Sequence, residues 1–272
     1  MKLRVALYCV LGGLSMLLPA MATGHVLWWY LSGLVLTAAF VPVAMFGPRS
    51  IVGQLGVILS VLFIVTVLTT WSEALLFVKV PAIQDHPFRN LAGEMFAYLV
   101  VGVALALLAR ALNINRQNGK LVVRHSVATA AAMLMVCGLA YMVYYLVFGA
   151  ITYQYFTKPY YPHAAELVAP LGIWFWAIQI GRGFLMTLAV LPAIYTLRLT
   201  RGKVAISAGL LIWVAGGLAP LLVPNELMGS TQRFIHIVEI FTQNFTLGVT
   251  AGLLLRPKHG AETNSKPMAV AA

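Results

Sequence analysis

The sequence has few charged residues, and acidic residues are the scarcest of them. Aspartate and glutamate number 7 in 272 residues. All charged residues make up 9% of the chain, whereas soluble domains are about a quarter charged. A soluble fold needs polar surface to cover its apolar core. With 61% hydrophobic residues, the chain lacks that cover. This composition excludes an ordinary soluble domain, and most of the outer surface is expected to face a lipid bilayer.

Cysteine and the common catalytic motifs are also missing. The 2 cysteines, Cys9 and Cys137, both lie in apolar runs, which excludes a disulfide framework. The chain contains no HExxH, CxxCH or GxSxG motif and no glycine-rich phosphate loop. The segments between apolar runs are too short for a soluble domain. Any site must therefore be built within the membrane-spanning helices.

Long hydrophobic runs are what the chain does have. Each approaches the length of about 20 residues that a helix needs to cross a bilayer. The predicted spans are 5–22, 26–46, 51–72, 91–112, 123–148, 167–195, 204–223 and 234–255. The fold class is therefore all-α, a polytopic membrane helical bundle of eight transmembrane helices. Residues 1–256 form a single integral membrane domain, and residues 257–272 are predicted to be a disordered cytoplasmic tail.

The basic residues predict the orientation of the bundle. If the N-terminus is cytoplasmic, 13 of the 18 lysines and arginines lie on the cytoplasmic side, 4 lie outside and Arg182 lies within a span. This asymmetry follows the positive-inside rule and also places the C-terminus in the cytoplasm. It explains the net charge of +11 better than nucleic-acid binding does. The short loops favour a bacterial inner membrane.

The first span has a second interpretation. Residues 1–22 contain a basic start, an apolar stretch and the sequence Ala20-Met21-Ala22, which together are typical of a cleaved signal peptide. Cleavage would leave seven helices with the same orientation.

Spans four and eight resemble each other. Glu94-Met95-Phe96 is followed by Gly102 and Arg110, and Glu239-Ile240-Phe241 is followed by Gly248 and Arg256, with one inserted residue before the second glycine. The similarity predicts a weak 4+4 parallel repeat, with chance similarity as the alternative.

The eighth span carries a narrow polar stripe. At about 100° per residue, six polar side chains fall within an arc of about 80°. They are Gln232, His236, Glu239, Gln243, Thr246 and Thr250, and Asn244 falls outside the arc. Such a stripe cannot face lipid. We therefore expect it to face protein or a water-filled cavity.

Arg182 is the expected partner of this stripe. It lies about 18 Å into span six, with Gln179 one turn away on the same face. We expect spans six and eight to pack together, with Arg182 facing Glu239 and Gln243.

Two further acids lie at the same depth. Glu73 ends span three, and Glu94 lies near the start of span four. The alternatives are structural: a register-fixing ion pair for Arg182, an interfacial charge for Glu73, and a helix-dipole contact for Glu94. For His236 the alternative is an ordinary hydrogen bond to a neighbour.

Three functions fit these residues. The first is transport of an ion or small solute through a polar cavity in the outer half, with protons carried by His236 and Glu239. The candidate cavity residues are Arg182, His236, Glu239, Gln243, Glu94, Glu73 and Gln179.

The second function is a non-catalytic assembly or partner-binding subunit of a membrane complex, as a homo-oligomer or with another membrane protein. Its candidate surface is the tyrosines at the outer end of span five, which are otherwise an interfacial aromatic belt. They are Tyr141, Tyr144, Tyr145, Tyr153, Tyr155, Tyr160 and Tyr161.

The third function is a metal- or haem-binding redox protein. His236 and Glu239 share a helix face, but a catalytic metal site needs a third protein ligand. His25, His86 and His163 lie in outer loops, and His25 is the candidate second ligand for a haem. No cofactor is assigned on this evidence.

Overall fold

The computed structural model describes residues 1–77, 86–116, 125–160, 172–225 and 228–257. Within these residues, eight helices are long and apolar enough to cross a membrane, and none of the described segments forms a strand. The predicted number and class of spans are therefore confirmed.

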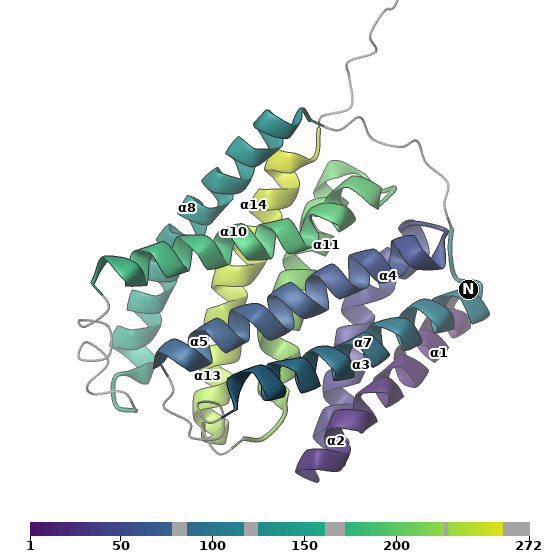
Figure 1. Cartoon of the computed structure of the whole chain (residues 1–272), viewed down its shortest axis with the longest axis horizontal. Helices are drawn as coiled ribbons and strands as arrows, with labels where there is room; N and C mark the ends of the chain where they lie inside the picture. The colour runs from purple at the N-terminus through teal and green to yellow at the C-terminus, as the bar shows by residue number, and fades with distance from the viewer. Residues whose placement is uncertain (78–85, 117–124, 161–171, 226–227, 258–272) are drawn as a thin grey trace, which may run out of the picture.

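The spans run in opposite directions in turn (Figure 1). The first four are α1 (Lys2–Gly13) continued by η1 (Leu14–Met16) and α2 (Leu17–Thr23); α3 (Val26–Phe46); α4 (Ile51–Ser60) continued by η2 (Val61–Leu68) and α5 (Thr69–Phe77); and α7 (Pro87–Ala111). The last four are α8 (Val127–Thr152) continued by η3 (Tyr153–Thr157); α10 (Ile173–Thr196); α11 (Arg201–Trp213) continued by η5 (Val214–Leu218) and α12 (Ala219–Leu222); and α13 (Ser230–Ile240) continued by η6 (Phe241–Phe245) and α14 (Thr246–Leu255).

Several predicted span boundaries are wrong, by as many as nine residues. The fourth span begins at Pro87 rather than at 91, because proline suits the first position of a helix. The fifth begins after the N-cap Ser126 rather than at 123 and continues to Thr157 instead of ending at 148. The predicted start of the sixth span at 167 and the predicted tail beyond 257 lie outside the described residues.

The two ends of the bundle differ in charge, and we name them by that difference. The acidic end, at the lower left of Figure 1, is where α5 ends and α7, α10 and α13 begin. Glu73, Glu94 and Glu239 lie toward it. The opposite end is the basic end, where Arg110, Arg201 and Arg256 lie close to helix termini.

A shared sequence pattern relates the second and sixth spans. Gly33, Thr37 and Pro42 of α3 recur at the same spacing as Gly183, Thr187 and Pro192 of α10. The hydroxyl group of each threonine donates to the carbonyl oxygen of its glycine, at 2.7 Å in α3 and 2.8 Å in α10.

The crossing of the first two spans recurs in the second half of the chain. A Cβ atom on Gly33 would lie 2.6 Å from the carbonyl oxygen of Gly13, because α1 and α3 are nearly in backbone contact. A Cβ atom on Gly183 would lie 3.2 Å from the Cα atom of Gly138, where α8 crosses α10. Small residues at helix crossings permit this approach in membranes. The repeated crossing supports the predicted 4+4 repeat.

The crossing of the third and fourth spans recurs in the same way. Gly102 of α7 lies against Leu59 of α4, and its counterpart Gly248 of α14 lies against Gly209 of α11. A Cβ atom on Gly248 would meet the backbone of Gly209 at 2.5 Å. The second half is therefore packed more tightly at this crossing, where glycine replaces leucine.

The inserted residue of the repeat has a structural counterpart. The insertion lies between Glu239 and Gly248, and the π-helical turn η6 (Phe241–Phe245) occupies this interval. A π turn is a wider loop of helix that holds one more residue than an α turn does. The polar groups before the turn and the glycine after it can therefore both keep the positions of their counterparts in α7.

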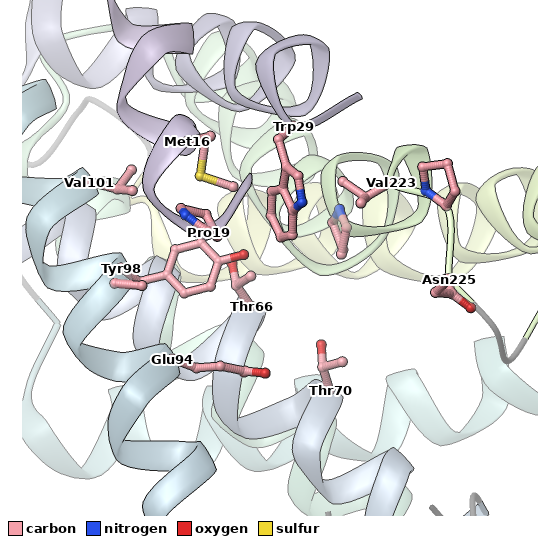
Figure 2. Close-up of a pocket in the computed structure, with 13 residues that line it drawn as sticks. Met16, Pro19, Trp29, Thr66, Thr70, Glu94, Tyr98, Val101, Val223 and Asn225 are labelled. Carbon is pink, nitrogen blue, oxygen red and sulfur yellow. The ribbon is translucent and has the colours of Figure 1, made fainter. Parts of the chain in front are cut away.

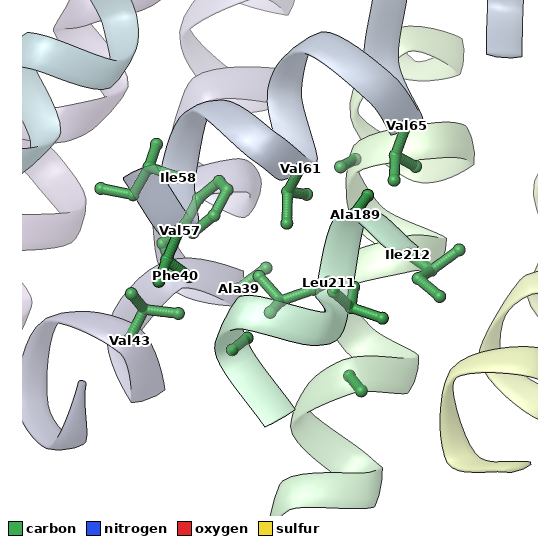
Figure 3. Packing of buried hydrophobic residues seen from close by; sticks show 14 of the residues in the cluster. Ala39, Phe40, Val43, Val57, Ile58, Val61, Val65, Ala189, Leu211 and Ile212 are labelled. Atoms are coloured by element: carbon green, nitrogen blue, oxygen red, sulfur yellow. The ribbon is translucent and has the colours of Figure 1, made fainter. Parts of the chain in front are cut away.

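Two further π-helical segments occupy matching places in the third and seventh spans. Segment η2 lies in the first half and η5 in the second, and they pack against each other where the halves meet. Apolar side chains surround this junction (Figure 3). Val61 and Val65 of the first half there face Ala189 and Ile212 of the second.

At the basic end of the bundle, arginine side chains donate hydrogen bonds to backbone carbonyl oxygens near helix termini. Arg256 donates to the carbonyl oxygens of Ile194 at 2.5 Å, Leu197 at 2.8 Å and Leu199 at 3.2 Å. Ile194 lies in the last turn of α10, and Leu197 and Leu199 follow the helix, so none of these carbonyls has a partner within α10. Arg201 likewise donates to the carbonyl oxygen of Leu253 near the end of α14.

We expect Gly248→Leu to disrupt the crossing of α11 and α14, because its side chain would overlap the Gly209 backbone. Overpacking of this kind costs about 1–3 kcal/mol or more. The measurement is the yield of monodisperse protein and its apparent unfolding temperature in detergent. Gly56→Leu is the control, because a Cβ atom there meets nothing within 4 Å. Equal stability of the two variants would contradict the crossing.

Candidate functional site

The seven predicted site residues form three groups at the acidic end. Arg182 contacts Glu73 and Gln179, and Glu239 contacts His236 and Gln243. Glu94 lies apart from both groups, beside Trp71.

Arg182 is the centre of the first group and lies within α10. Its side chain is 8% exposed, and its Nη1 atom lies 2.5 Å from Oε1 of Glu73. The same nitrogen donates to Oε1 of Gln179 at 2.9 Å. The guanidinium carbon lies 5.8 Å from the ring centroid of Tyr141, within the range of a cation–π contact. One buried cation is thus held by a carboxylate, an amide and an aromatic ring.

The expected pairing of Arg182 with Glu239 and Gln243 is wrong. Spans six and eight do pack together, but the end of span three, which carries Glu73, also packs against α10 and supplies the carboxylate. The sequence gives the depth of each residue in its span. It does not give which helix packs against α10 at that depth.

Glu239 is the centre of the second group. Its Oε2 atom lies 3.0 Å from Nδ1 of His236, and Gln243 donates from Nε2 to its Oε1 at 3.2 Å. Both Glu239 and Gln243 face Gly149 of α8, where a Cβ atom would lie 3.6 Å from Oε1 of Glu239. Thr250, further along the same stripe, bonds to the hydroxyl of Tyr144 of α8. The polar stripe of the eighth span therefore faces α8.

The two groups share neighbours. The charges of Glu73, Arg182 and Glu239 all act on the hydroxyl groups of Tyr141 and Tyr145 on α8. Tyr141 is buried, so the prediction that the whole tyrosine group lies in an interfacial belt is wrong for this residue. It is instead a wall of the polar cluster, which we define as Glu73, Gln179, Arg182, His236, Glu239 and Gln243.

Asn244 lies off the stripe, as helical spacing predicts, and is buried against the seventh span. The π turn η6 contains Gln243 and Asn244, and both are 3% exposed. The amide nitrogen of Asn244 lies beside Gly216, 3.1 Å from where a Cβ atom would stand. The only advance signal of the π turn was the inserted residue.

Glu94 does not lie in a first helical turn, so the helix-dipole interpretation is wrong. Because α7 begins at Pro87, Glu94 lies two turns into the helix. It accepts a hydrogen bond from Nε1 of Trp71 at 2.7 Å. It also lines a cavity of about 280 Å³ that lies between spans of both halves (Figure 2).

Two donors of the polar cluster have no acceptor among the described residues. They are Nε of Arg182 and Nε2 of Gln179, which are both buried. Buried polar groups in folded proteins nearly always have a hydrogen-bond partner, whether protein, water or ligand. Neighbouring donors of this kind can bind an acceptor group of a small polar molecule.

The described residues bring no three histidine, cysteine or acidic side chains together in a way that could hold a metal ion. His25 and His86 are the N-cap residues of α3 and α7, and His163 lies outside the described residues. The expectation of a metal or haem therefore gains no ligand set from the described part of the chain.

Comparison with models of protein families finds no match, and comparisons with curated proteins and with solved structures also find none. The fold and composition define the class: the chain is a multi-pass α-helical membrane protein whose spans lie in a lipid bilayer.

We expect Arg182→Met to destabilise the protein, because it leaves the carboxylate of Glu73 without its cation. The loss is about 2 kcal/mol, between the values for exposed and fully buried pairs. The double variant Arg182→Met/Glu73→Gln should regain much of this stability in thermal unfolding. The matched double variant Arg182→Met/Glu239→Gln should not. Equal rescue by both carboxyl substitutions would contradict the observed pairing.

Proposed function

We propose that the protein is a membrane carrier for a small polar solute and that it couples transport to proton movement. The polar cluster is its solute site. The observation that carries this proposal is the pair of buried donors without acceptors, Nε of Arg182 and Nε2 of Gln179. A carboxylate, carbonyl or hydroxyl group of a solute could accept from both, while Glu73 and Tyr141 hold the guanidinium in place.

Glu239 and His236 are the proposed proton carriers. Their side chains are 15% and 22% exposed, and they are hydrogen-bonded to each other. Imidazole and carboxyl groups change charge readily when their surroundings change, and such groups within membranes commonly relay protons. Gln243 continues the chain of polar groups from Glu239 toward the middle of the span. Proton binding at Glu239 would alter the charge that a solute meets in the cluster.

We also propose the orientation and location. The acidic end faces the outside and the basic end faces the cytoplasm, together with the C-terminus, in a bacterial inner membrane. The distribution of lysine and arginine supports this orientation.

The transport proposal predicts solute-dependent proton flux. Purified protein is reconstituted into liposomes that contain a pH-sensitive dye, and amino acids, monocarboxylates and sugars are added outside in turn. At least one class should change the internal pH. Glu239→Gln should abolish the change, because its amide does not titrate, while the protein still folds.

Thr242→Val is the control on the same helix. Within the described part of the chain, the Thr242 hydroxyl bonds only to the backbone carbonyl of Glu239, so its loss should leave proton flux intact. If Glu239→Gln retained full flux with a transported solute, proton coupling through Glu239 would be wrong. If no solute class moved protons or accumulated, the carrier proposal itself would fail.

The orientation predicts which single cysteines an impermeant maleimide labels in intact spheroplasts. Ser230→Cys, at the acidic end, should react from outside, and Ser126→Cys, at the basic end, should react only after lysis. Both serines are exposed and nearly isosteric with cysteine. The parent chain, whose cysteines lie within spans, sets the background. The reverse labelling pattern would overturn the orientation.

A second candidate, a partner-binding subunit, has one observation in its favour. Large aromatic side chains are exposed where α8 ends and α10 begins. They include Tyr155, Phe156, Tyr160 and Trp174. Such a group fits either a membrane-interface belt or a docking surface for a homo-oligomer or another membrane protein. Recovery of a stable complex that Tyr155→Ala abolishes, with no transport by any variant, would favour this candidate.

A further inference from the structure

The cavity beside Glu94 is separate from the polar cluster. Its volume is about 280 Å³, and it lies between α7, the third span and the chain after α12 (Figure 2). Its walls are mostly apolar or aromatic, with Trp29 and Tyr98 as the largest side chains. The few polar groups among these walls therefore determine what it can bind.

Glu94 is the charged group among the residues that line the cavity. The indole of Trp71 donates to one carboxylate oxygen, and this bond orients the side chain. No arginine, lysine or histidine among the described residues forms an ion pair with it. The cavity therefore presents a negative charge beside aromatic walls.

Thr66 points to a ligand independently of Glu94. Its side chain is 6% exposed and lines the cavity, and its hydroxyl has no hydrogen-bond partner within the described structure. A buried hydroxyl without a partner loses its interaction with water and gains nothing in exchange. Thr70, one helical turn further along the third span, also lines the cavity (Figure 2).

The similarity between the two halves allows the surroundings of Glu94 to be compared with those of the matching residue in the second half. Glu94 corresponds to Glu239, and Trp29 corresponds to Gln179, at the spacings that relate the glycines of the two halves. In the second half the guanidinium of Arg182 lies beside Gln179 and pairs with Glu73. In the first half the position of Arg182 is taken by Ser32, whose hydroxyl donates to the backbone oxygen of Ala219. The first half therefore has the carboxylate and the aromatic wall but no internal guanidinium.

We infer that the Glu94 cavity is a binding site for a small organic cation of the guanidinium or alkylammonium class. The carboxylate of Glu94 neutralises the charge, and the rings of Trp29 and Tyr98 contact the cation and its alkyl part. The hydroxyls of Thr66 and Thr70 accept hydrogen bonds from its N–H groups. The ligand would supply Glu94 with a cation, as Arg182 does for Glu73. This inference does not rest on the proposed transport, because binding alone is required.

The test compares ethylguanidinium with ethylurea, which has nearly the same shape but no charge. Purified protein in detergent is titrated with each, and binding is followed by tryptophan fluorescence, since Trp29 and Trp71 lie at the site. Ethylguanidinium should bind, and ethylurea should bind at least about tenfold more weakly. Glu94→Gln should weaken ethylguanidinium binding by at least about tenfold.

Two milder variants keep the test decisive if Glu94→Gln folds poorly. Glu94→Asp keeps the charge and should retain binding, whereas Thr66→Val removes the unpartnered hydroxyl with little change of shape and should weaken binding severalfold. Phe96→Leu is the control, because this α7 side chain is 63% exposed and is not part of the cavity wall. Equal binding of the charged and neutral probes, or no loss with both Glu94→Gln and Thr66→Val, would overturn the inference.

Discussion

The constraint that governs this molecule is that a membrane offers polar groups no water, so each must find its partner within the protein. At the basic end, Arg256 donates hydrogen bonds to backbone carbonyls at the end of α10. Toward the acidic end, Arg182 and Glu73 are each other's partners in an ion pair. Gln179 and Thr66 are two of the places where the described structure leaves the constraint unmet, and they lie at the two sites where we expect bound molecules.

Close packing at glycines explains how so apolar a chain builds a defined core. Glycines at helix crossings bring backbones into contact, and both halves use them at equivalent positions, as Gly33 and Gly183 do. Apolar burial alone gives little preference for one helix partner over another in lipid, so close packing must supply the specificity. The π-helical segments η2 and η5 meet where the two halves join, and η6 absorbs the extra residue of the second half.

The sequence was sufficient for what depends on length and composition, and insufficient for what depends on contacts between spans. Eight spans and a polar stripe on the last helix follow from hydropathy and from helical spacing. The partner of Arg182 does not, because depth in the membrane leaves several carboxylates equivalent, and packing selected Glu73 over Glu239. The burial of Asn244 against the seventh span could not be predicted either, since hydropathy and helical spacing do not identify which spans pack together.

The two similar halves of the chain carry different side chains at matching positions. Ser32 in the first half corresponds to Arg182 in the second. Arg182 pairs with Glu73 of span three, so a cation of the second half neutralises a carboxylate of the first. Glu94 of the first half has no charged partner among the described residues. A difference in charge at one position therefore links the two halves electrostatically and leaves one carboxylate without a counterion.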